Sequence, residues 1–226
     1  MGLTKTARQV NWFAPSACAR EDVSLDGARH RNRAHLNTVV ASPGAGSSWG
    51  VLAADYDDQA TGWPEWSGSQ AGYTDTVRGA LGYLDWFGAL PADPLVLEVG
   101  AGSGEASAVL AGRFGRLVVS DVSAKMLNQV TTPGVPRVVA DVRRLPFDSQ
   151  SVDLVVGLNA VPHAAEIGRV LKPNGCVAWC ASFWRHTPLY VDPEALAGEL
   201  GPRWRGVARR VGPGSWSVFH RQPRSV

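Results

Sequence analysis

The stretch Leu95-Val-Leu-Glu-Val-Gly-Ala-Gly-Ser-Gly104 decides the fold of this chain. Its first five residues are mainly apolar, which is typical of a strand buried in a parallel sheet. Gly100, Gly102 and Gly104 then remove the side chains from a turn into a helix, so that backbone can approach a ligand closely. Glu98 adds an acidic group at the end of the strand. This turn suits a nucleoside with a positively charged tail better than a pyrophosphate.

Strand and helix patterns alternate along the rest of the chain. Gly212-Pro-Gly214 joins the last two apolar segments as a hairpin. The alternation predicts an α/β fold, a Rossmann-like, doubly wound, seven-stranded sheet that is mainly parallel, with one antiparallel strand from the C-terminal hairpin. The expected strands cover residues 95–99, 116–120, 137–140, 152–158, 176–182, 204–210 and 215–221.

The N-terminal part of the chain differs from the rest. Residues 1–48 show no sustained periodicity, carry scattered arginines and end in a stretch rich in Ser and Gly, so we expect a poorly ordered N-terminal tail. We expect a single domain over residues 49–226, with an N-terminal helical cap at 49–90 and a Rossmann-like core at 91–226. The cap is rich in aromatic residues, which line a ligand cleft, pack over an edge of the sheet, or do both.

Composition narrows the class of protein. The chain has 226 residues and a formal net charge of +2, which gives no electrostatic argument for a nucleic-acid partner. No apolar run approaches the roughly 20 residues that span a membrane, and no apolar segment typical of a signal peptide occurs at the N-terminus. We therefore expect a cytoplasmic protein without a membrane partner. Cys18, Cys176 and Cys180 are too scattered for a disulfide framework, and we expect no metal site.

Acidic residues follow three of the expected strands. Glu98, Asp121 and Asp141 stand at the ends of consecutive strands, and ligands of open parallel sheets bind beyond the carboxyl ends of the strands. Asp121 follows Glu98 by 23 residues, about the distance at which an acid on the second strand meets ribose hydroxyls. One such acid is often only a helix cap, but three around a glycine turn indicate a nucleoside site.

Four blocks of the sequence resemble, in order and spacing, the class I S-adenosylmethionine-dependent methyltransferases, in particular the branch that acts on small molecules. The resemblance covers about residues 95–181, and its blocks are Glu98–Gly104, Val119–Met126, Ala140–Val156 and Glu166–Gly175. It implies that residues 49–226 form a methyltransferase domain with S-adenosyl-L-methionine as cofactor. It also implies methyl transfer to an O or N atom of a small-molecule acceptor by in-line displacement.

The resemblance assigns residues to the methionine part of the cofactor. Glu98 shapes the floor of that site, and Asn159 is expected near the sulfonium and the methionine carboxylate. Tyr56 is similar to the aromatic residue on the N-terminal lid of the family. The residues that wrap the methionine part are the three glycines, Gly100, Gly102 and Gly104.

The resemblance assigns a second set of residues to the adenosine part of the cofactor. Asp121 is expected to hold the ribose hydroxyls. Val122 and Met126 are expected beside the adenine, while Asp141 and Val142 are expected to meet its amine and ring edge.

The sequence indicates the catalytic base and the methyl acceptor less clearly than it indicates the cofactor site. Residues 159–166 form a shorter segment than the family usually has where acceptor-facing residues lie. A base is needed only for a hydroxyl or a protonated amine, and His163 is the best placed candidate, with His186 and Tyr56 as others. A histidine at a helix start is more often a cap or a surface group. The aromatic residues between Trp49 and Trp86, with Phe183 and Trp184, favour a flat or apolar acceptor.

Two other functions remain open from the sequence. A NAD(P)-dependent oxidoreductase needs Gly-x-Gly-x-x-Gly, which would put its third glycine at Glu105. A non-catalytic or non-methylating S-adenosylmethionine-binding protein would need no base. A nucleic-acid acceptor is less expected, because Asn159-Ala-Val-Pro162 lacks the Asn/Asp-Pro-Pro-aromatic motif of base-methylating members.

Overall fold

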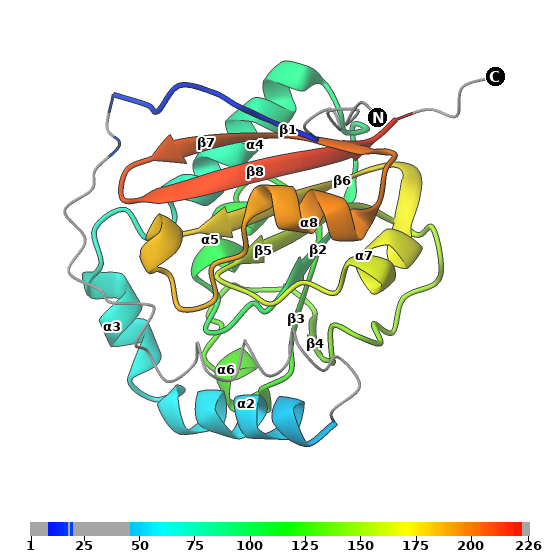
Figure 1. Cartoon of the computed structure of the whole chain (residues 1–226). Coiled ribbons are helices and arrows are strands. Elements are labelled where there is room, and N and C mark those ends of the chain that lie inside the picture. The colour runs from blue at the N-terminus through cyan, green and yellow to red at the C-terminus, as the bar shows by residue number, and fades with distance from the viewer. Residues whose placement is uncertain (1–8, 18, 20–45, 223–226) are drawn as a thin grey trace, which may run out of the picture.

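The computed structural model describes residues 9–17, 19 and 46–222, which form an α/β fold around one eight-stranded sheet (Figure 1). The strand order is β1-β7-β8-β6-β5-β2-β3-β4. The strands are β1 (Val10–Trp12), β2 (Leu95–Val99), β3 (Arg116–Asp121), β4 (Arg137–Val139), β5 (Val152–Leu158), β6 (Leu171–Ala181), β7 (Trp204–Val211) and β8 (Gly214–Arg221).

The directions of the strands confirm a mainly parallel sheet. Strand β8 runs antiparallel to both of its neighbours, β6 and β7, and every other pairing is parallel. The chain places β3 and β4 on one side of β2 and then returns to place β5 on the other side. The strand order therefore reverses between β2 and β5, which is where a sheet of this kind opens a ligand crevice.

The strand count is eight, not the expected seven, because β1 comes from the segment that we expected to be a tail. Val10 pairs with Gly206 of β7 and is only 1% exposed. The backbone N–H of Gly206 donates to the Gln9 carbonyl at 2.8 Å. A three-residue strand is too short to show periodicity, so the tail expectation is wrong for Val10–Trp12. Most of the remaining tail, including Cys18, lies outside the described residues.

Helices cover both faces of the sheet (Figure 1). Helices α4 and α5 pack on one face, and α7 and α8 pack on the other. Side chains alternate along a strand, so Leu97 and Val99 of β2 join the core under α7 and α8, whereas Val96 joins the core under α4. The helices are α2 (Gly46–Gln59), α3 (Trp63–Ser69), α4 (Asp75–Phe87), α5 (Glu105–Ala111), α6 (Ala124–Leu127), α7 (Ala164–Val170), α8 (Pro193–Leu200) and the short 3₁₀ turn η1 (Trp184–His186).

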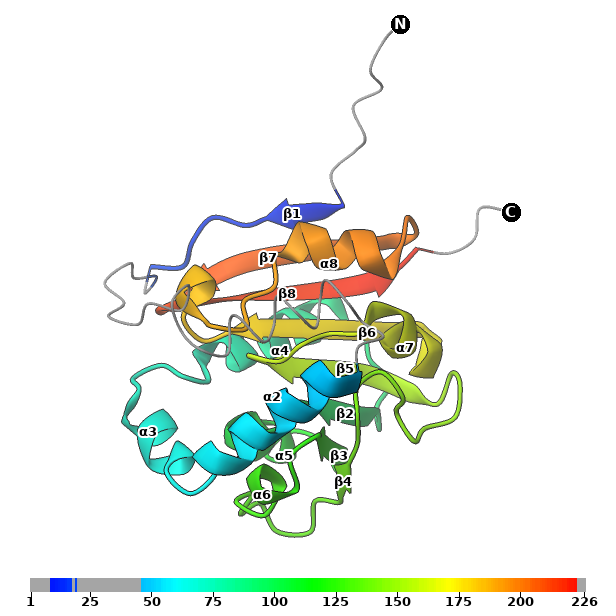
Figure 2. The same cartoon turned by 60° about the horizontal axis from the view of Figure 1, so that its bottom comes forward.

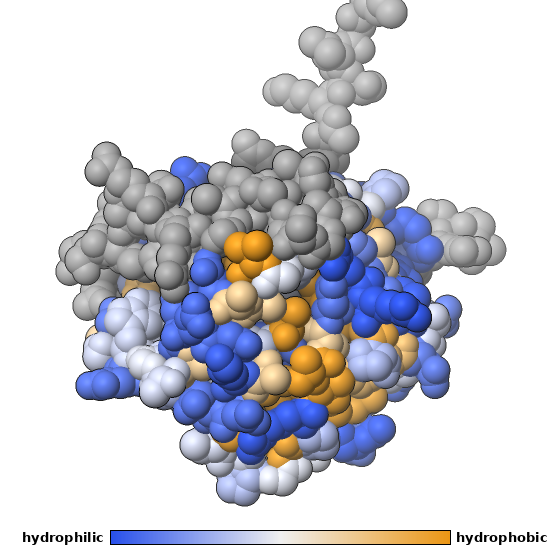
Figure 3. Space-filling model, turned by 90° about the horizontal axis from the view of Figure 1, so that it is seen from below, coloured by the Kyte–Doolittle hydropathy of each residue, from blue (hydrophilic) through white to orange (hydrophobic). Residues whose placement is uncertain are grey.

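Helix α2 lies beside α6, across the end of the sheet that carries the glycine turn (Figure 2). The hydroxyl of Ser123, the N-cap of α6, donates a hydrogen bond to Asp57 of α2 and accepts one from Met126 N at 3.0 Å. On the face seen in Figure 3, apolar side chains gather among hydrophilic ones. In the described part of the chain, none of the helices has both the length and the apolar character needed to cross a membrane.

Candidate functional site

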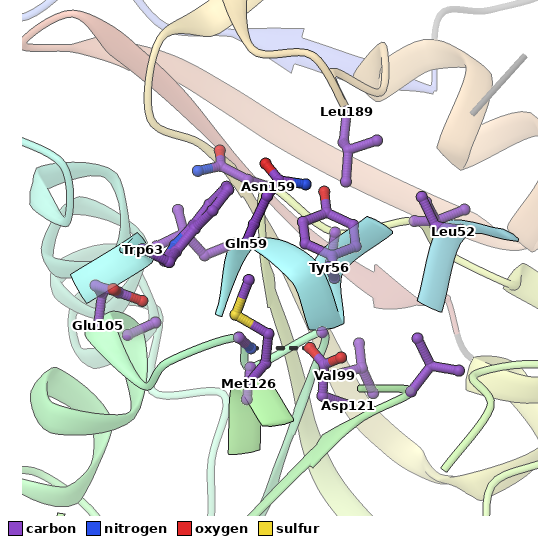
Figure 4. A pocket seen from close by; sticks show the side chains of 18 of the residues that line it. Leu52, Tyr56, Gln59, Trp63, Val99, Glu105, Asp121, Met126, Asn159 and Leu189 are labelled. Atoms are coloured by element: carbon purple, nitrogen blue, oxygen red, sulfur yellow. Dashed lines mark hydrogen bonds between the residues drawn. The ribbon is translucent and has the colours of Figure 1, made fainter. Parts of the chain in front are cut away.

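A cavity of about 530 Å³ lies at the carboxyl ends of β2, β3 and β5, beneath α2 and α3 (Figure 4). Its position matches the point where the strand order reverses, and its size is ordinary for a small-molecule site. Most of the predicted cofactor residues line it: Tyr56, Glu98, Gly100, Gly102, Asp121, Val122, Met126, Val142 and Asn159. The fold therefore brings together predicted residues from five separate parts of the chain.

The glycine turn forms one wall of the cavity. Gly100 has φ +64°, and a Cβ there would lie 2.6 Å from the Cβ of Ala160. Gly102 has φ +55° and places its backbone N–H against Asp121. Gly104, with φ +94°, is the N-cap of α5 and packs against Val130; it supports the turn and is not among the lining residues.

Asp121 is fixed by two backbone hydrogen bonds. Its Oδ2 accepts from Gly102 N at 2.9 Å, and its Oδ1 accepts from Ser123 N at 2.8 Å. Burial raises the pKa of this carboxyl above its ordinary value, while the backbone donors act in the opposite direction. Each oxygen keeps a second lone pair, so the carboxylate can still accept hydrogen bonds from a ligand.

Glu98 is fully buried at the end of β2 and still borders the cavity. Ser107 Oγ donates to its Oε2 at 2.6 Å. Burial raises the pKa of Glu98 to about 8, and the nearby Glu105 and Asp121 act in the same direction. The carboxyl is therefore mostly protonated at neutral pH, a state that the sequence alone did not indicate.

Asn159 links the ends of two strands at the cavity wall. Its φ is +52°, which Asn tolerates better than most residues. Its Nδ2 donates to Tyr73 Oη at 3.0 Å and to Ser182 Oγ at 2.9 Å, and its Oδ1 accepts from Ser182 N at 2.8 Å. The side chain thus positions Tyr73 of the cap relative to the sheet.

Asp141 and His163 were predicted site residues that do not appear among the described lining residues. Asp141 forms an ion pair with Arg143, whose guanidinium lies 4.8 Å from the ring centroid of Trp49, itself a lining residue. Arg143 lowers the pKa of Asp141. His163 is the half-buried N-cap of α7, without a side-chain capping bond, and its Nδ1 has no hydrogen-bond partner among the described residues. His163 lies close enough to Asp141 to lower the pKa of that carboxyl as well.

Aromatic rings from residues 49–90 form a continuous cluster along the cavity. Ring centroids lie 5.8 Å apart for Tyr56 and Trp63, 5.2 Å for Trp63 and Trp66, and 6.0 Å for Trp66 and Tyr73. Phe183, after β6, lies 5.8 Å from Tyr73. All five rings line the cavity.

Glu105 is a lining residue that the sequence reasoning missed. The sequence patterns gave it no role in the cofactor site. It lies in the first turn of α5, on the same side of the cavity as Trp63 (Figure 4). Its Oε1 accepts hydrogen bonds from Ser67 Oγ of α3 and, at 2.5 Å, from Ser103 Oγ. The position directly after the third glycine was the available signal.

The two cysteines within the described chain are free and buried. Cys176 and Cys180 lie in β6 within the same core, and burial raises the pKa of the Cys176 thiol to about 11. No group of three or more metal-ligating side chains occurs within residues 9–17, 19 and 46–222.

Residues 97–179 match the methyltransferase domain family. A demethylmenaquinone methyltransferase of Mycobacterium sp. (strain KMS) is 37% identical over 92 residues, which are 38% of this chain and 40% of that protein. A ubiquinone/menaquinone biosynthesis C-methyltransferase of Bordetella parapertussis is 38% identical over 96 residues, 35% of this chain and 37% of that protein. The chain thus spans about two fifths of the length of these curated relatives.

Solved structures resemble the fold of this chain over more residues than the family match covers. The structure of DhpI in complex with SAH has a TM-score of 0.57 and 20% identity, and the match covers 76% of this chain and 95% of that one. A SAM-dependent methyltransferase from Aquifex aeolicus has a TM-score of 0.50 and 20% identity, with 62% and 88% covered. Over residues 97–179 the chain matches the methyltransferase domain family, and the chain shares its fold with the DhpI and Aquifex aeolicus structures.

Proposed function

We propose that this protein uses S-adenosylmethionine to transfer a methyl group to an O or N atom of a small-molecule acceptor by in-line displacement. The observation that supports this most is the cavity at the strand-order reversal, where the glycine turn and Asp121 meet an apolar wall. That wall consists of Val122, Met126, Ala140 and Val142.

The residues present fit S-adenosylmethionine. A Cβ at Gly102 would meet no atom within 4 Å, so the methionine part can lie against open backbone there. Asp121 would hold the ribose hydroxyls, because its oxygens are oriented by Gly102 and Ser123 and retain accepting capacity. The apolar wall would hold the adenine. When bound, the cofactor supplies an electrophilic methyl group on a sulfonium.

The chain's own contribution to the reaction is alignment and the exclusion of water. We propose that residues 49–90, which contain α2, α3 and α4, act as the cap over the core of residues 91–226. Tyr56 of α2 and Trp63 of α3 face the cavity from the cap, while Leu189 borders it from the segment before α8 (Figure 4). A closed apolar cover keeps water from the reacting atoms and holds the acceptor in line.

The curated relatives support a small-molecule acceptor, since their names refer to demethylmenaquinone and to ubiquinone/menaquinone biosynthesis. Their matches span fewer than half of the residues of this chain, so we do not extend their acceptors to it. We propose a cytoplasmic protein without nucleic-acid or membrane partners, on the grounds of charge and composition given above.

The proposal is tested in two stages. Calorimetric titration with S-adenosylmethionine, S-adenosylhomocysteine and NADH is expected to show binding of the first two and no heat with NADH. Acceptor libraries are then screened for transfer of labelled methyl groups from S-adenosylmethionine. Binding of S-adenosylmethionine without methyl transfer to any acceptor would favour a non-methylating binding protein. Binding of NADH alone would favour an oxidoreductase.

A further inference from the structure

The ionisable residues that line the cavity are all acidic apart from its tyrosines. They are Asp58, Glu98, Glu105 and Asp121, of which Glu98 is mostly protonated at neutral pH, and among the described lining residues there is no lysine, arginine or histidine. The proposed cofactor site uses Asp121 and Glu98. Glu105 is not needed there, which leaves one half-buried carboxylate at the edge of the cavity beside the cap.

One carboxylate oxygen of Glu105 is held by hydrogen bonds within the protein, and the other is available to a ligand. Oε1 accepts from the hydroxyls of both Ser67 and Ser103, so the carboxylate is held between α3 and the glycine turn. No described residue donates a hydrogen bond to Oε2. Two neutral hydroxyl donors fix the orientation of the group without cancelling its negative charge, so it can still attract a cation.

Aromatic rings line the same cavity as this carboxylate. Trp63 lies on the same side of the cavity as Glu105 (Figure 4). Burial raises the pKa of Tyr73, and the negative charge of Glu105 adds to this rise, so the phenol lies within electrostatic range of Glu105. The rings of Trp66 and Tyr73 meet edge to face at 86°, and both residues line the cavity. Faces of aromatic rings attract cations, and they do so more strongly away from water.

Building on the proposed function, we propose that the acceptor is an amine on an apolar body, bound through its nitrogen by Glu105 Oε2 against Trp63, Trp66 and Tyr73. This combination of one carboxylate with several ring faces favours a group that is cationic or donates N–H bonds. Acceptors that react as anions, such as phenolates, enolates and carboxylates, are disfavoured by the acidic lining.

Methyl transfer from the cofactor to an amine nitrogen accounts for every bond, proton and electron pair. An acceptor that arrives as the ammonium first gives one proton to water, which leaves a lone pair on nitrogen. The nitrogen then forms a bond to the methyl carbon while the bond from that carbon to sulfur breaks, and its electron pair stays on sulfur. The product is an N-methylammonium ion, which the same carboxylate and rings can bind before release.

The test compares three probes that differ only in their end group: phenethylamine, 2-phenylethanol and 3-phenylpropanoate. They are titrated into the protein loaded with S-adenosylhomocysteine, so that affinity is measured without turnover. We expect phenethylamine to bind at least about tenfold more tightly than the alcohol, since a charge-assisted hydrogen bond is stronger than a neutral one, and the anion to bind weakest. Glu105→Gln is expected to abolish the preference, because its amide can still accept from Ser67 and Ser103 but carries no charge.

The matched control is Glu65→Gln, which removes an exposed acid from α3 and is expected to leave the preference intact. Equal affinity for the amine and the alcohol, no binding of the amine, or a preference that survives Glu105→Gln would each overturn the inference. Exclusive methylation of a quinol in the acceptor screen would do the same while leaving the proposed function standing. If S-adenosylhomocysteine itself fails to bind, the proposed function fails instead.

Discussion

Gly102 and Asp121 meet across the cavity floor, where the backbone N–H of the glycine donates to the aspartate Oδ2 at 2.9 Å. The contact joins the turn after β2 to the end of β3, two segments that are adjacent in the sheet. It orients the carboxylate that we assign to the ribose hydroxyls. The Asp121 carboxylate therefore contributes both to the proposed cofactor site and to the packing of the glycine turn.

Replacement of Asp121 is expected to weaken cofactor binding strongly. Asp121→Asn keeps an acceptor for one backbone donor but loses the charge, so we expect the affinity for S-adenosylhomocysteine to fall at least about tenfold. Calorimetry measures the effect. The control is Asp93→Asn, which changes an exposed aspartate paired with Arg116 at the surface. Equal affinities of the Asp121 variant and the unaltered protein would remove Asp121 from the site.

Gly100→Ala is expected to destabilise the fold and impair the site. The new Cβ would lie 2.6 Å from Ala160 Cβ at a residue with φ +64°. We expect a loss of about 1–3 kcal/mol in the free energy of unfolding, together with weaker cofactor binding. Denaturant titration provides the measurement.

Gly82→Ala is the matched control for that substitution. Gly82 lies within α4, and a Cβ there would meet nothing within 4 Å. We expect it to be neutral or to stabilise the protein by up to about 1 kcal/mol, because alanine is the better helix former. Similar losses in the two variants would mean that the glycine turn carries no special constraint.

The stability of the protein is expected to depend on pH through Glu98. Burial raises the pKa of this carboxyl in the folded protein from the ordinary 4.5 to about 8. Between these values the folded state binds more protons at this group than the unfolded chain does, so the free energy of unfolding falls as the pH rises through that window. Glu98→Gln, which stays neutral, is expected to flatten this dependence in denaturant titrations. An unchanged slope in the variant would contradict the assignment.

The same carboxyl is expected to make binding of the sulfonium depend on pH. A cation favours the ionised form of Glu98, so the affinity for S-adenosylmethionine relative to S-adenosylhomocysteine should rise as the pH approaches about 8. The comparison of the two compounds cancels the titration of their shared amino group. Calorimetry at several pH values checks this, and Glu98→Gln should remove most of the trend.

His163→Ala is expected to change turnover by less than about twofold, because a general base must lie within hydrogen-bond reach of the proton it removes. His163 caps α7 near Asp141 and is not among the described residues of the cavity wall. Initial rates of S-adenosylhomocysteine formation, once an acceptor is known, measure the effect. A loss of tenfold or more would restore His163 as the base.

The sequence by itself determined the parts of this protein that follow from local patterns. The apolar run before Gly100 predicted β2, and the spacing from Glu98 to Asp121 placed both residues at one cavity, because parallel neighbours end at the same edge of a sheet. The alternation of strands and helices likewise predicted helices on both faces, and the hairpin turn predicted the antiparallel strand β8.

Only the tertiary structure decided the features that depend on contacts between distant residues. Strand β1 is defined by its pairing with β7, since its three residues show no pattern of their own. Glu105 lines the cavity in an orientation that depends on a hydrogen bond from Ser67, 38 residues earlier in the chain. Glu98 became a largely protonated acid through burial, a property of its surroundings that residue type and spacing do not record.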